Sequence, residues 1–472
     1  MLEIRELKAQ GPKSVVRVAN TARVPVFTEV TALAGDKRVH YQLLCPICDC
    51  RCDDDGTLLS CPSPHPPALL RSCYSSRTLE VDPDAEGIYR YQCWLPRANR
   101  LKDAPRSVPY RSEQLGSALG LKNLWIAFSG YWPERGAKLE TASFKELEVG
   151  GVLSRIPRPD ARVLVVASAG NTAAAFGRAC SENELACLIV VPSSGMEKLR
   201  FAAPLRACVK VVRLTGHAGY SDAIALAERV AQQPGFVGEG GVKNVGRRDG
   251  MATVIYSAVE AMGKLPDYYF QGIGSGAGAI AAHEGAMRLV RDSRFGLVPP
   301  RLMLAQNAPF TPIYDSWQRG NRELVEVDPA RARILADKIV AKVLSNRQPP
   351  YAIRGGTYDV IRESRGEMFA VDNEEILRAG EMFERYEGID LDPAAGVAVA
   401  ALIKAAKTGR VRSAEAVLLH ITGGGARKRA AEKMLIFSPA DLELSIEELE
   451  TPATLERVCN LFAKRRSMHS GV

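Results

Sequence analysis

Long apolar runs, histidines and clusters of basic residues are all scarce in this sequence. No run approaches the roughly 18 apolar residues of a membrane span, and the opening MLEIRE is not the apolar core of a signal peptide, so we expect a cytoplasmic protein without a membrane partner. With six histidines and no serine in a G-x-S-x-G motif, a hydrolase triad has little support. The net charge is only +8, and no Lys/Arg run is interleaved with aromatic residues, so we expect no nucleic-acid partner.

The composition is that of an ordinary globular protein, with 46% apolar and 25% charged residues. A chain of 472 residues exceeds one ordinary hydrophobic core, which predicts two or three domains. Eleven cysteines in a cytoplasmic protein are expected to be thiols or metal ligands, because disulfides are rare in that compartment.

Four side chains that can bind a metal ion follow one another near the N-terminus, in the pattern C-x2-C-x12-C-x3-H. They are Cys45, Cys48, Cys61 and His65. A C-x2-C pair can direct two thiolates at one zinc ion, and the other two side chains would complete a tetrahedron. We therefore predict an N-terminal extension over residues 1–95 with a structural zinc site. With only one such pair, a small hairpin without metal is the alternative, and Cys50 and Cys52 are alternative ligands.

From about residue 140 the sequence alternates short apolar runs with segments of helical pattern. Strands are predicted at 161–167, 185–192 and 209–214, and helices at 147–155, 173–180 and 221–232. Further strands are predicted at 89–96, 123–128, 268–271 and 416–422, and a further helix at 279–290. Continuous apolar strands that alternate with helices are typical of a buried parallel sheet, so the pattern predicts an open α/β fold.

Small polar residues and glycines follow two of these strands, at the ends where open α/β sheets bind ligands. The loop SAGNT at 168–172 places hydroxyl and N–H groups at a helix start, which suits a carboxylate, although the loop could merely cap the helix. The loop GIGSGAG at 272–278 has the strand–glycine–helix order of a phosphate site. It also fits a loosened dinucleotide fingerprint, but the acidic residue expected about 20 positions later is missing, so a nicotinamide enzyme is the weaker alternative.

Four single residues stand out beside these loops. Lys145 lies between a small-residue turn and the predicted helix at 147–155, where it can offer an amine to an aldehyde. Thr422 ends a strand before three glycines and either presents a neutral hydroxyl to a ligand or only ends the strand. Arg354 precedes two glycines and can present a guanidinium to an oxyanion, or serve as a surface charge. His420 is expected to be a hydrogen-bonded core residue.

The order of these segments, with Asp392-Pro393-Ala394 before Thr422, resembles that of the fold type II pyridoxal-phosphate (PLP) enzymes, which include threonine synthase, cysteine synthase and tryptophan synthase β. The resemblance covers roughly residues 100–430. It implies an α/β fold of two open domains with the cofactor in the cleft between them. The large domain would comprise 96–139 and 246–472, and a small, mobile substrate-binding domain would comprise 140–245. Homodimers are common among such enzymes, so we expect a homodimer by analogy.

The resemblance also implies a role for each loop. Lys145 would be catalytic and would join PLP as a Schiff base, the glycine loop would bind the cofactor phosphate, and Thr422 would face the ring nitrogen. The implied cofactor-binding residues are Lys145, Asn171, Gly274, Ser275, Gly276, Ala277, Gly278 and Thr422. The implied substrate-binding residues are Ser168, Ala169, Gly170, Asn171, Thr172 and Arg354.

Within this group the chain resembles the cysteate synthases. The likeness lies in SFKELE at 143–148, where threonine synthases usually have Asp-Arg after the lysine, in the N-terminal cysteine segment, and in residues 346–356. It implies that small anionic substrates react, with O-phospho-L-serine and sulfite giving L-cysteate and phosphate. A threonine synthase, or another β-replacement enzyme with a different nucleophile, is the first alternative. A non-catalytic binding protein on the same scaffold is the second.

Overall fold

The computed structural model describes residues 40–157, 162–168 and 170–463. The first 39 residues of the predicted N-terminal extension, and the predicted substrate-binding residue Ala169, lie outside the described residues. Two large sheets and one small sheet organise the described part, and none of its helices is long and apolar enough to cross a membrane.

The larger sheet has six strands in the order β15-β14-β13-β16-β5-β4, all parallel except for β4 at its edge. Its strands are β4 (Val108–Arg111), β5 (Leu124–Phe128), β13 (Tyr268–Gly272), β14 (Arg301–Asn307), β15 (Glu367–Val371) and β16 (Val417–Ile421). Helices α5 (Val245–Met262), α6 (Ala277–Asp292), α7 (Pro312–Gln318) and α9 (Thr357–Glu363) cover one face. Helices α1 (Gln114–Ala118), α10 (Asn373–Glu387) and α11 (Pro393–Lys407) cover the other. Side chains alternate between the two faces along β14, as its buried apolar sequence requires.

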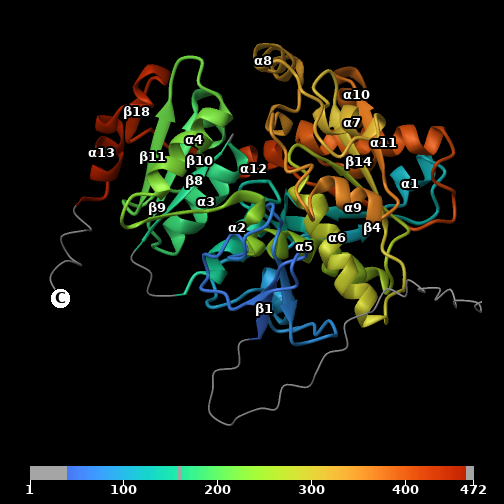
Figure 1. The fold of residues 1–472 in the computed structure, drawn as a ribbon. Helices are drawn as coiled ribbons and strands as arrows, with labels where there is room; N and C mark the ends of the chain where they lie inside the picture. The colour runs from blue at the N-terminus through green and yellow to red at the C-terminus, as the bar shows by residue number, and fades with distance from the viewer. Residues whose placement is uncertain (1–39, 158–161, 169, 464–472) are drawn as a thin grey trace, which may run out of the picture. The chain divides into compact units, whose positions relative to one another are not determined.

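The second large sheet has five parallel strands in the order β12-β8-β9-β11-β18. Its strands are β8 (Val163–Ala167), β9 (Cys187–Pro192), β11 (Val209–Leu214), β12 (Phe236–Gly238) and β18 (Leu442–Leu444). Helices α2 (Lys145–Arg155) and α3 (Asn171–Glu182) pack on one face, and α4 (Tyr220–Ala231) and α13 (Pro452–Asn460) on the other. Figure 1 shows β8, β9 and β11 to the left of α2 and α5, and β14 to their right.

The edge strand β18 differs from the predicted domain boundaries. The prediction assigned residues 246–472 to the large domain, whereas Leu442–Leu444 pairs with β11 of the sheet built from the 140–245 region. A three-residue strand of alternating pattern carries too weak a signal to be assigned to a sheet from sequence. The division into a large domain and a small mobile domain otherwise stays a prediction.

Helices α2 and α5 cross in direct backbone contact between the two sheets. A Cβ atom at Gly151 of α2 would lie 2.0 Å from the carbonyl oxygen of Gly246 on α5, so only glycine permits this approach. Because α2 begins at Lys145, the crossing fixes the helix that carries this lysine against the layer of helices on the larger sheet.

The third sheet is antiparallel, in the order β2-β1-β3, and lies beside α2 and α5 in Figure 1. Its strands are β1 (Tyr41–Leu44), β2 (Arg51–Cys52) and β3 (Arg71–Tyr74). The remaining elements are the pairs β6 (Tyr131–Trp132) with β7 (Ala137–Lys138) and β10 (Arg200–Phe201) with β17 (Ile436–Phe437), helices α8 (Pro329–Lys338) and α12 (Ala426–Glu432), and short 3-10 turns.

Most predicted elements are confirmed, but one predicted strand is wrong. Residues 89–96 were expected to be a strand, whereas Gly87–Trp94 forms a 3-10 helix. The segment is kinked at Tyr91, and its buried residues are Ile88, Tyr89, Tyr91 and Trp94. Three of these recur every third position, the period of a 3-10 helix. The strand preference of aromatic residues depends on having a sheet to pack on, and here they pack in the core around α5 instead.

Candidate functional site

A cavity of about 80 Å³ lies at the carboxyl ends of the central strands of the larger sheet. Strand β13 leads into its glycine loop, and Thr422 follows β16. The cavity is lined by Ser143, Phe144, Lys145, Asn171, Gln271, Gly272, Ile273, Gly274, Ser275, Gly276, Ala277, Gly278, Val343, Leu344, Asp392, Ala394 and Thr422. The structure therefore brings every predicted cofactor-binding residue to one pocket, including Asn171 from the start of α3, which packs on the second sheet.

The glycine loop joins β13 to the N-terminus of α6. Gly276 has φ +80, and a Cβ atom there would lie 2.3 Å from Thr357 Oγ1, so the loop needs glycine to keep its path. The first N–H groups of a helix have no partner within the helix, and those of α6 begin at Ala277 in the pocket lining. Backbone N–H groups at a helix start suit a phosphate dianion, so the loop fits the phosphate of PLP.

Lys145 is held close to Thr422 by backbone contacts. Ser143 forms an isolated antiparallel bridge with Gly423, and the Phe144 N–H donates to the Thr422 carbonyl at 3.0 Å. The lysine and the threonine that were predicted to lie at opposite ends of the cofactor ring thus line the same cavity. The Lys145 side chain is 22% exposed, and its Nζ donates to Glu148 Oε2 at 3.0 Å.

Glu148 is a residue beside Lys145 whose role no motif in the sequence indicates. Its side chain is fully buried, and it accepts hydrogen bonds from Lys145, from Thr172 Oγ1 at 2.9 Å and from Arg247 at 2.8 Å. Burial opposes its ionisation, but Arg247 and Lys145 beside it hold the pKa of this carboxyl below its usual value. The predicted helix began at residue 147 and left Lys145 outside it, whereas the observed helix begins at Lys145 and makes the two residues neighbours at i,i+3 spacing.

Arg247 connects Glu148 to the rest of the fold. Its guanidinium also donates to Glu239 at 2.8 Å through Nε, and although burial lowers its pKa, the two carboxylates raise it overall. Arg247 therefore neutralises buried carboxylates and is not positioned as a spare cation for substrate.

The loop at 168–172 combines capping and pocket residues. Ser168 Oγ accepts from the N–H groups of Gly170 at 3.0 Å and Ala173 at 2.8 Å, which is the capping role considered as an alternative. Asn171 lines the pocket, and Thr172 donates to Glu148. The loop is thereby linked through one carboxylate to the lysine, and its binding of a substrate carboxylate stays a prediction.

The structure does not bring Arg354 to the cavity. Its side chain is 56% exposed and forms an ion pair with Asp359 at 3.8 Å, and Asp359 also binds Arg322 at 2.7 Å. A different cation, Lys198, approaches the predicted substrate loop. Its Nζ lies 3.4 Å from Oδ2 of the pocket residue Asp392, and a Cβ atom at Gly170 would lie 2.9 Å from its Cγ.

His420 is confirmed as a hydrogen-bonded core residue. It is 1% exposed, and its ring nitrogens lie 2.7 Å from Tyr269 Oη and 3.1 Å from Ser129 Oγ. Burial lowers the pKa of His420 to about 3, so the ring is neutral at physiological pH. His420 packs edge-to-face against the ring of the pocket residue Phe144, and it does not itself line the pocket.

The four predicted metal ligands also meet. One ligand atom each from Cys45, Cys48, Cys61 and His65 lies within 4.8 Å of the other three. The cluster could hold a metal ion, and it lies in the connections between the strands of the small antiparallel sheet, outside the cavity lining.

Known proteins match this sequence over most of its length. The family described as "Pyridoxal-phosphate dependent enzyme" matches residues 111–423. A cysteate synthase from Methanoculleus marisnigri is 46% identical over 398 residues, which is 84% of this chain and 91% of that protein. The chain belongs to the cysteate synthase family. A second cysteate synthase, from Methanosarcina barkeri, is 42% identical over 389 residues, covering 81% of this chain and 93% of that protein.

Among solved structures, maize serine racemase aligns with a TM-score of 0.53 at 15% identity, covering 69% of this chain and 91% of that one. At this identity the likeness concerns the fold, and it confirms the fold type II architecture. The protein is a PLP-dependent enzyme of the elimination and replacement class. The family match favours the phosphate interpretation of the glycine loop over the dinucleotide one.

Proposed function

We propose that this protein replaces the phosphate of O-phospho-L-serine with sulfite, giving L-cysteate and phosphate. The observation that carries the proposal is the similarity to proteins named cysteate synthase over more than 90% of their length, at 42–46% identity. The pocket supports it, because a lysine amine, a glycine loop at a helix start and a neutral hydroxyl surround one cavity.

The residues present fit PLP. Lys145 would hold it covalently, residues Gly274 to Gly278 would bind its phosphate, Asn171 would reach its phenolic oxygen, and Thr422 would face its ring nitrogen. The chemistry that PLP would supply is electron withdrawal from the substrate Cα, which would make the Cα proton acidic and allow phosphate to leave from Cβ.

Lys145 Nζ is the group that takes the Cα proton and later returns it. Glu148 Oε2, which accepts a hydrogen bond from Nζ, orients the amine within reach of the cavity. Thr422 offers a neutral hydroxyl where a carboxylate would keep the ring nitrogen charged, and this favours elimination and replacement over transamination.

Lys198 is the cation that we propose for the substrate's anionic groups. It lies over Gly170 of the predicted carboxylate loop, and its present partner Asp392 lines the cavity. A phosphate or sulfite would compete with Asp392 for this ammonium group. Closure of the predicted mobile domain, which carries Lys198 and Asn171, would exclude water from the reacting Cβ.

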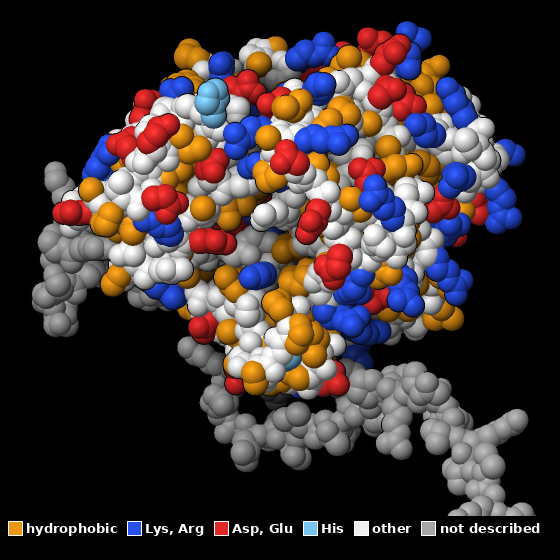
Figure 2. Space-filling model, turned by 45° about the horizontal axis from the view of Figure 1, so that its top comes forward, with side chains coloured by type: hydrophobic (Ala, Val, Ile, Leu, Met, Phe, Trp, Pro, Cys, Tyr) orange, Lys and Arg blue, Asp and Glu red, His pale blue; other side chains and the backbone are white. Residues whose placement is uncertain are grey.

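The protein acts on small substrates, and we propose that it does so as a cytoplasmic homodimer. The cytoplasm suits Cys45, Cys48 and Cys61, whose thiols stay reduced there. No nucleic-acid partner is proposed, and Figure 2 shows acidic and basic side chains interspersed over the face drawn.

The test is an absorbance spectrum of protein purified with PLP, followed by product analysis with O-phosphoserine and sulfite. We expect a visible cofactor band, and formation of cysteate and phosphate in equal amounts. Lys145→Ala should lose both, whereas Lys138→Ala, at the exposed position of β7, should keep both. Threonine formed from O-phosphohomoserine, with no cysteate from phosphoserine, would replace the proposal with the threonine synthase alternative.

A further inference from the structure

The cysteine and histidine cluster on the small sheet has the geometry of a closed tetrahedral metal site. Cys48 Sγ and Cys61 Sγ are 3.7 Å apart, and Cys45 Sγ lies 3.2 Å from His65 Nε2. Two sulfurs bonded to one zinc at about 2.3 Å in a tetrahedron lie about 3.8 Å apart. Three sulfurs and one imidazole nitrogen leave no open coordination position, which is the donor set of a structural zinc site.

The histidine is oriented for this role by its second nitrogen. His65 Nδ1 lies 2.7 Å from the carbonyl oxygen of Pro66, and since a carbonyl only accepts, Nδ1 carries the proton. Nε2 is then the nitrogen with a free lone pair, and it is the one that faces Cys45 Sγ. Metal-binding histidines are held by such a hydrogen bond on the other nitrogen.

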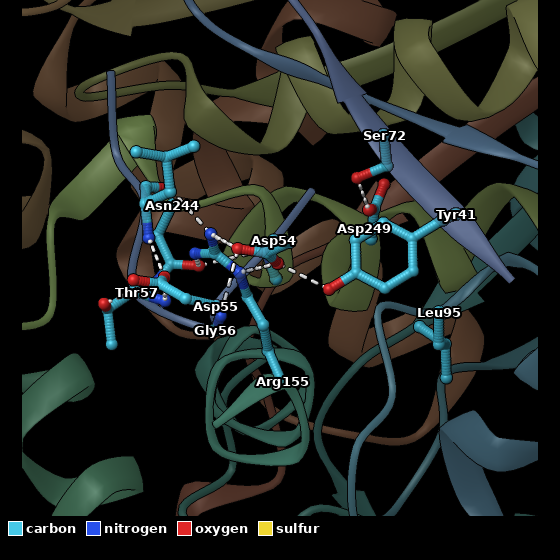
Figure 3. Close-up of polar contacts among 12 residues, drawn as sticks. Tyr41, Asp54, Asp55, Gly56, Thr57, Ser72, Leu95, Arg155, Asn244 and Asp249 are labelled. Carbon is cyan, nitrogen blue, oxygen red and sulfur yellow. Dashed lines mark hydrogen bonds and ion pairs between the residues drawn. The ribbon is translucent and has the colours of Figure 1, made fainter. Parts of the chain in front are cut away.

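The loop between two of these ligands binds the end of α2. Asp54, between Cys48 and Cys61, accepts two hydrogen bonds at 2.7 Å from the guanidinium of Arg155, and the Leu58 carbonyl accepts a third at 2.6 Å. Figure 3 shows Arg155 enclosed by Asp54 and by Asn244 from the start of α5. The Arg155 and Asp54 side chains are 0% and 1% exposed, so neither charge has water as an alternative partner.

Arg155 is the last residue of α2, and Lys145 is the first. At 1.5 Å per residue the two lie about 15 Å apart along one rigid helix. The small sheet also binds α5, because Ser72 and Tyr74 of β3 donate to Asp249 at 2.5 Å and 2.7 Å. Both α2, which carries Lys145, and α5, which crosses α2, are therefore hydrogen-bonded to the cysteine-rich segment at 41–74.

The segment has little apolar core of its own with which to hold these contacts. The apolar cluster that contains Leu43 and Cys45 has three other buried members, Ala68, Leu70 and Val245, of which Val245 belongs to α5. Its remaining members are only partly buried: Tyr41, Cys50, Cys52, Leu58 and Cys61. Small units of this kind need a staple such as a metal ion to stay folded. We propose that Cys45, Cys48, Cys61 and His65 bind one structural zinc ion, which fixes the loop at 49–60 and thereby holds α2, and with it Lys145, in place.

Metal content tests the site. Protein expressed with zinc and purified without chelator is expected to contain about one zinc per chain. Cys61→Ser should lower the bound zinc by about 10-fold or more, whereas Cys50→Ser, in the same loop but outside the cluster, should leave it unchanged. Wild-type protein without stoichiometric zinc, or a Cys61→Ser protein that keeps it, would overturn the proposal.

Cobalt substitution in the wild-type protein tests the site even where Cys61→Ser does not fold. The intense visible bands of tetrahedral, thiolate-bound cobalt are the expected result. Weak octahedral bands would exclude the proposed ligand set.

Hydrogen–deuterium exchange tests the link to α2. Asp54→Asn is not a ligand change, so it should keep zinc but speed exchange in peptides covering 145–155 several-fold, with no change in α10. Removal of zinc by a chelator should give the same local pattern. Unchanged exchange in 145–155 after zinc removal, or faster exchange everywhere, would refute the link. Zinc and exchange are measured without substrate, so a protein that meets these expectations yet forms no cysteate refutes only the proposed function.

Discussion

Replacing Glu148 by glutamine tests whether this buried carboxylate organises the pocket. All three of its partners, Lys145, Thr172 and Arg247, are hydrogen-bond donors. A glutamine keeps one acceptor oxygen but turns an NH2 group towards at least one of these donors. The pKa of Glu148 is held below its usual value, so the substitution removes a full negative charge at neutral pH.

The contacts of Glu148 give the expected size of two effects, on the free energy of unfolding and on kcat. Breaking a buried ion pair by removing one partner costs about 3–5 kcal/mol of the free energy of unfolding. A hydrogen bond to a charged group contributes about 1.5–3 kcal/mol, so misplacing the Lys145 amine is expected to lower kcat about 10- to 150-fold.

Glu146 provides the matched control. It lies two residues earlier on α2, is 5% exposed and pairs with Arg178 at 2.8 Å, away from the lysine amine. Chemical denaturation should show that Glu146→Gln and Glu148→Gln both destabilise the fold. Steady-state kinetics well below the unfolding temperature should show the large loss of kcat, and weaker PLP binding by absorbance titration, only in Glu148→Gln. Equal kinetic losses in the two variants would reduce Glu148 to a purely structural residue.

Three further outcomes are expected. Gly276→Ala should weaken PLP binding far more than Gly120→Ala, because both glycines have positive φ but only the first has no room for a Cβ atom; equal effects in the titration would contradict this. Lys198→Ala should raise the KM for O-phosphoserine about 10-fold, with a smaller change in kcat, because it removes the proposed substrate cation. Asp392→Asn removes the carboxylate that pairs with the same ammonium group, so it should not raise this KM in steady-state kinetics. Burial lowers the pKa of His420 to about 3 in the folded state, whereas the pKa in the unfolded chain is about 6.5. The free energy of unfolding is therefore unaffected by this histidine above pH 6.5 and falls as pH falls towards 3, by about 5 kcal/mol at most. Denaturation at several pH values should show this slope in the wild type, and the same slope in His420→Gln would exclude the histidine as its source.

The pocket could be predicted from the sequence because its parts are local signals at strand ends. The apolar runs at 163–167, 268–272 and 417–421 are continuous, as in a buried parallel sheet, and the loops that follow the last two line the cavity. Parallel strands bring their carboxyl ends to one edge, so segments 100 or more residues apart converge without any pairwise signal.

Residues that act through distant partners could not be placed in the same way. Arg354 was expected near an oxyanion, but its ion-pair partner is Asp359 in the first turn of α9, outside the cavity. Lys198 carries no local motif, and only the fold brings it over the loop at 168–172. Glu148 becomes a helical neighbour of Lys145 only because α2 begins at Lys145, two residues earlier than predicted, and its other partner Arg247 is 99 positions away.

The contacts of the cysteine-rich segment also bear on how the chain folds during synthesis. The partner of Asp54 is Arg155, which is synthesised 101 residues later, and the partner of Ser72 is Asp249, 177 residues later. At about 5–20 residues per second, the ribosome needs about 10–35 s to supply the second of these partners. A zinc ion bound by residues 45–65 would hold this early segment in its native form during that interval. Helices α2 and α5 would then pack on a segment that is already folded when they are synthesised.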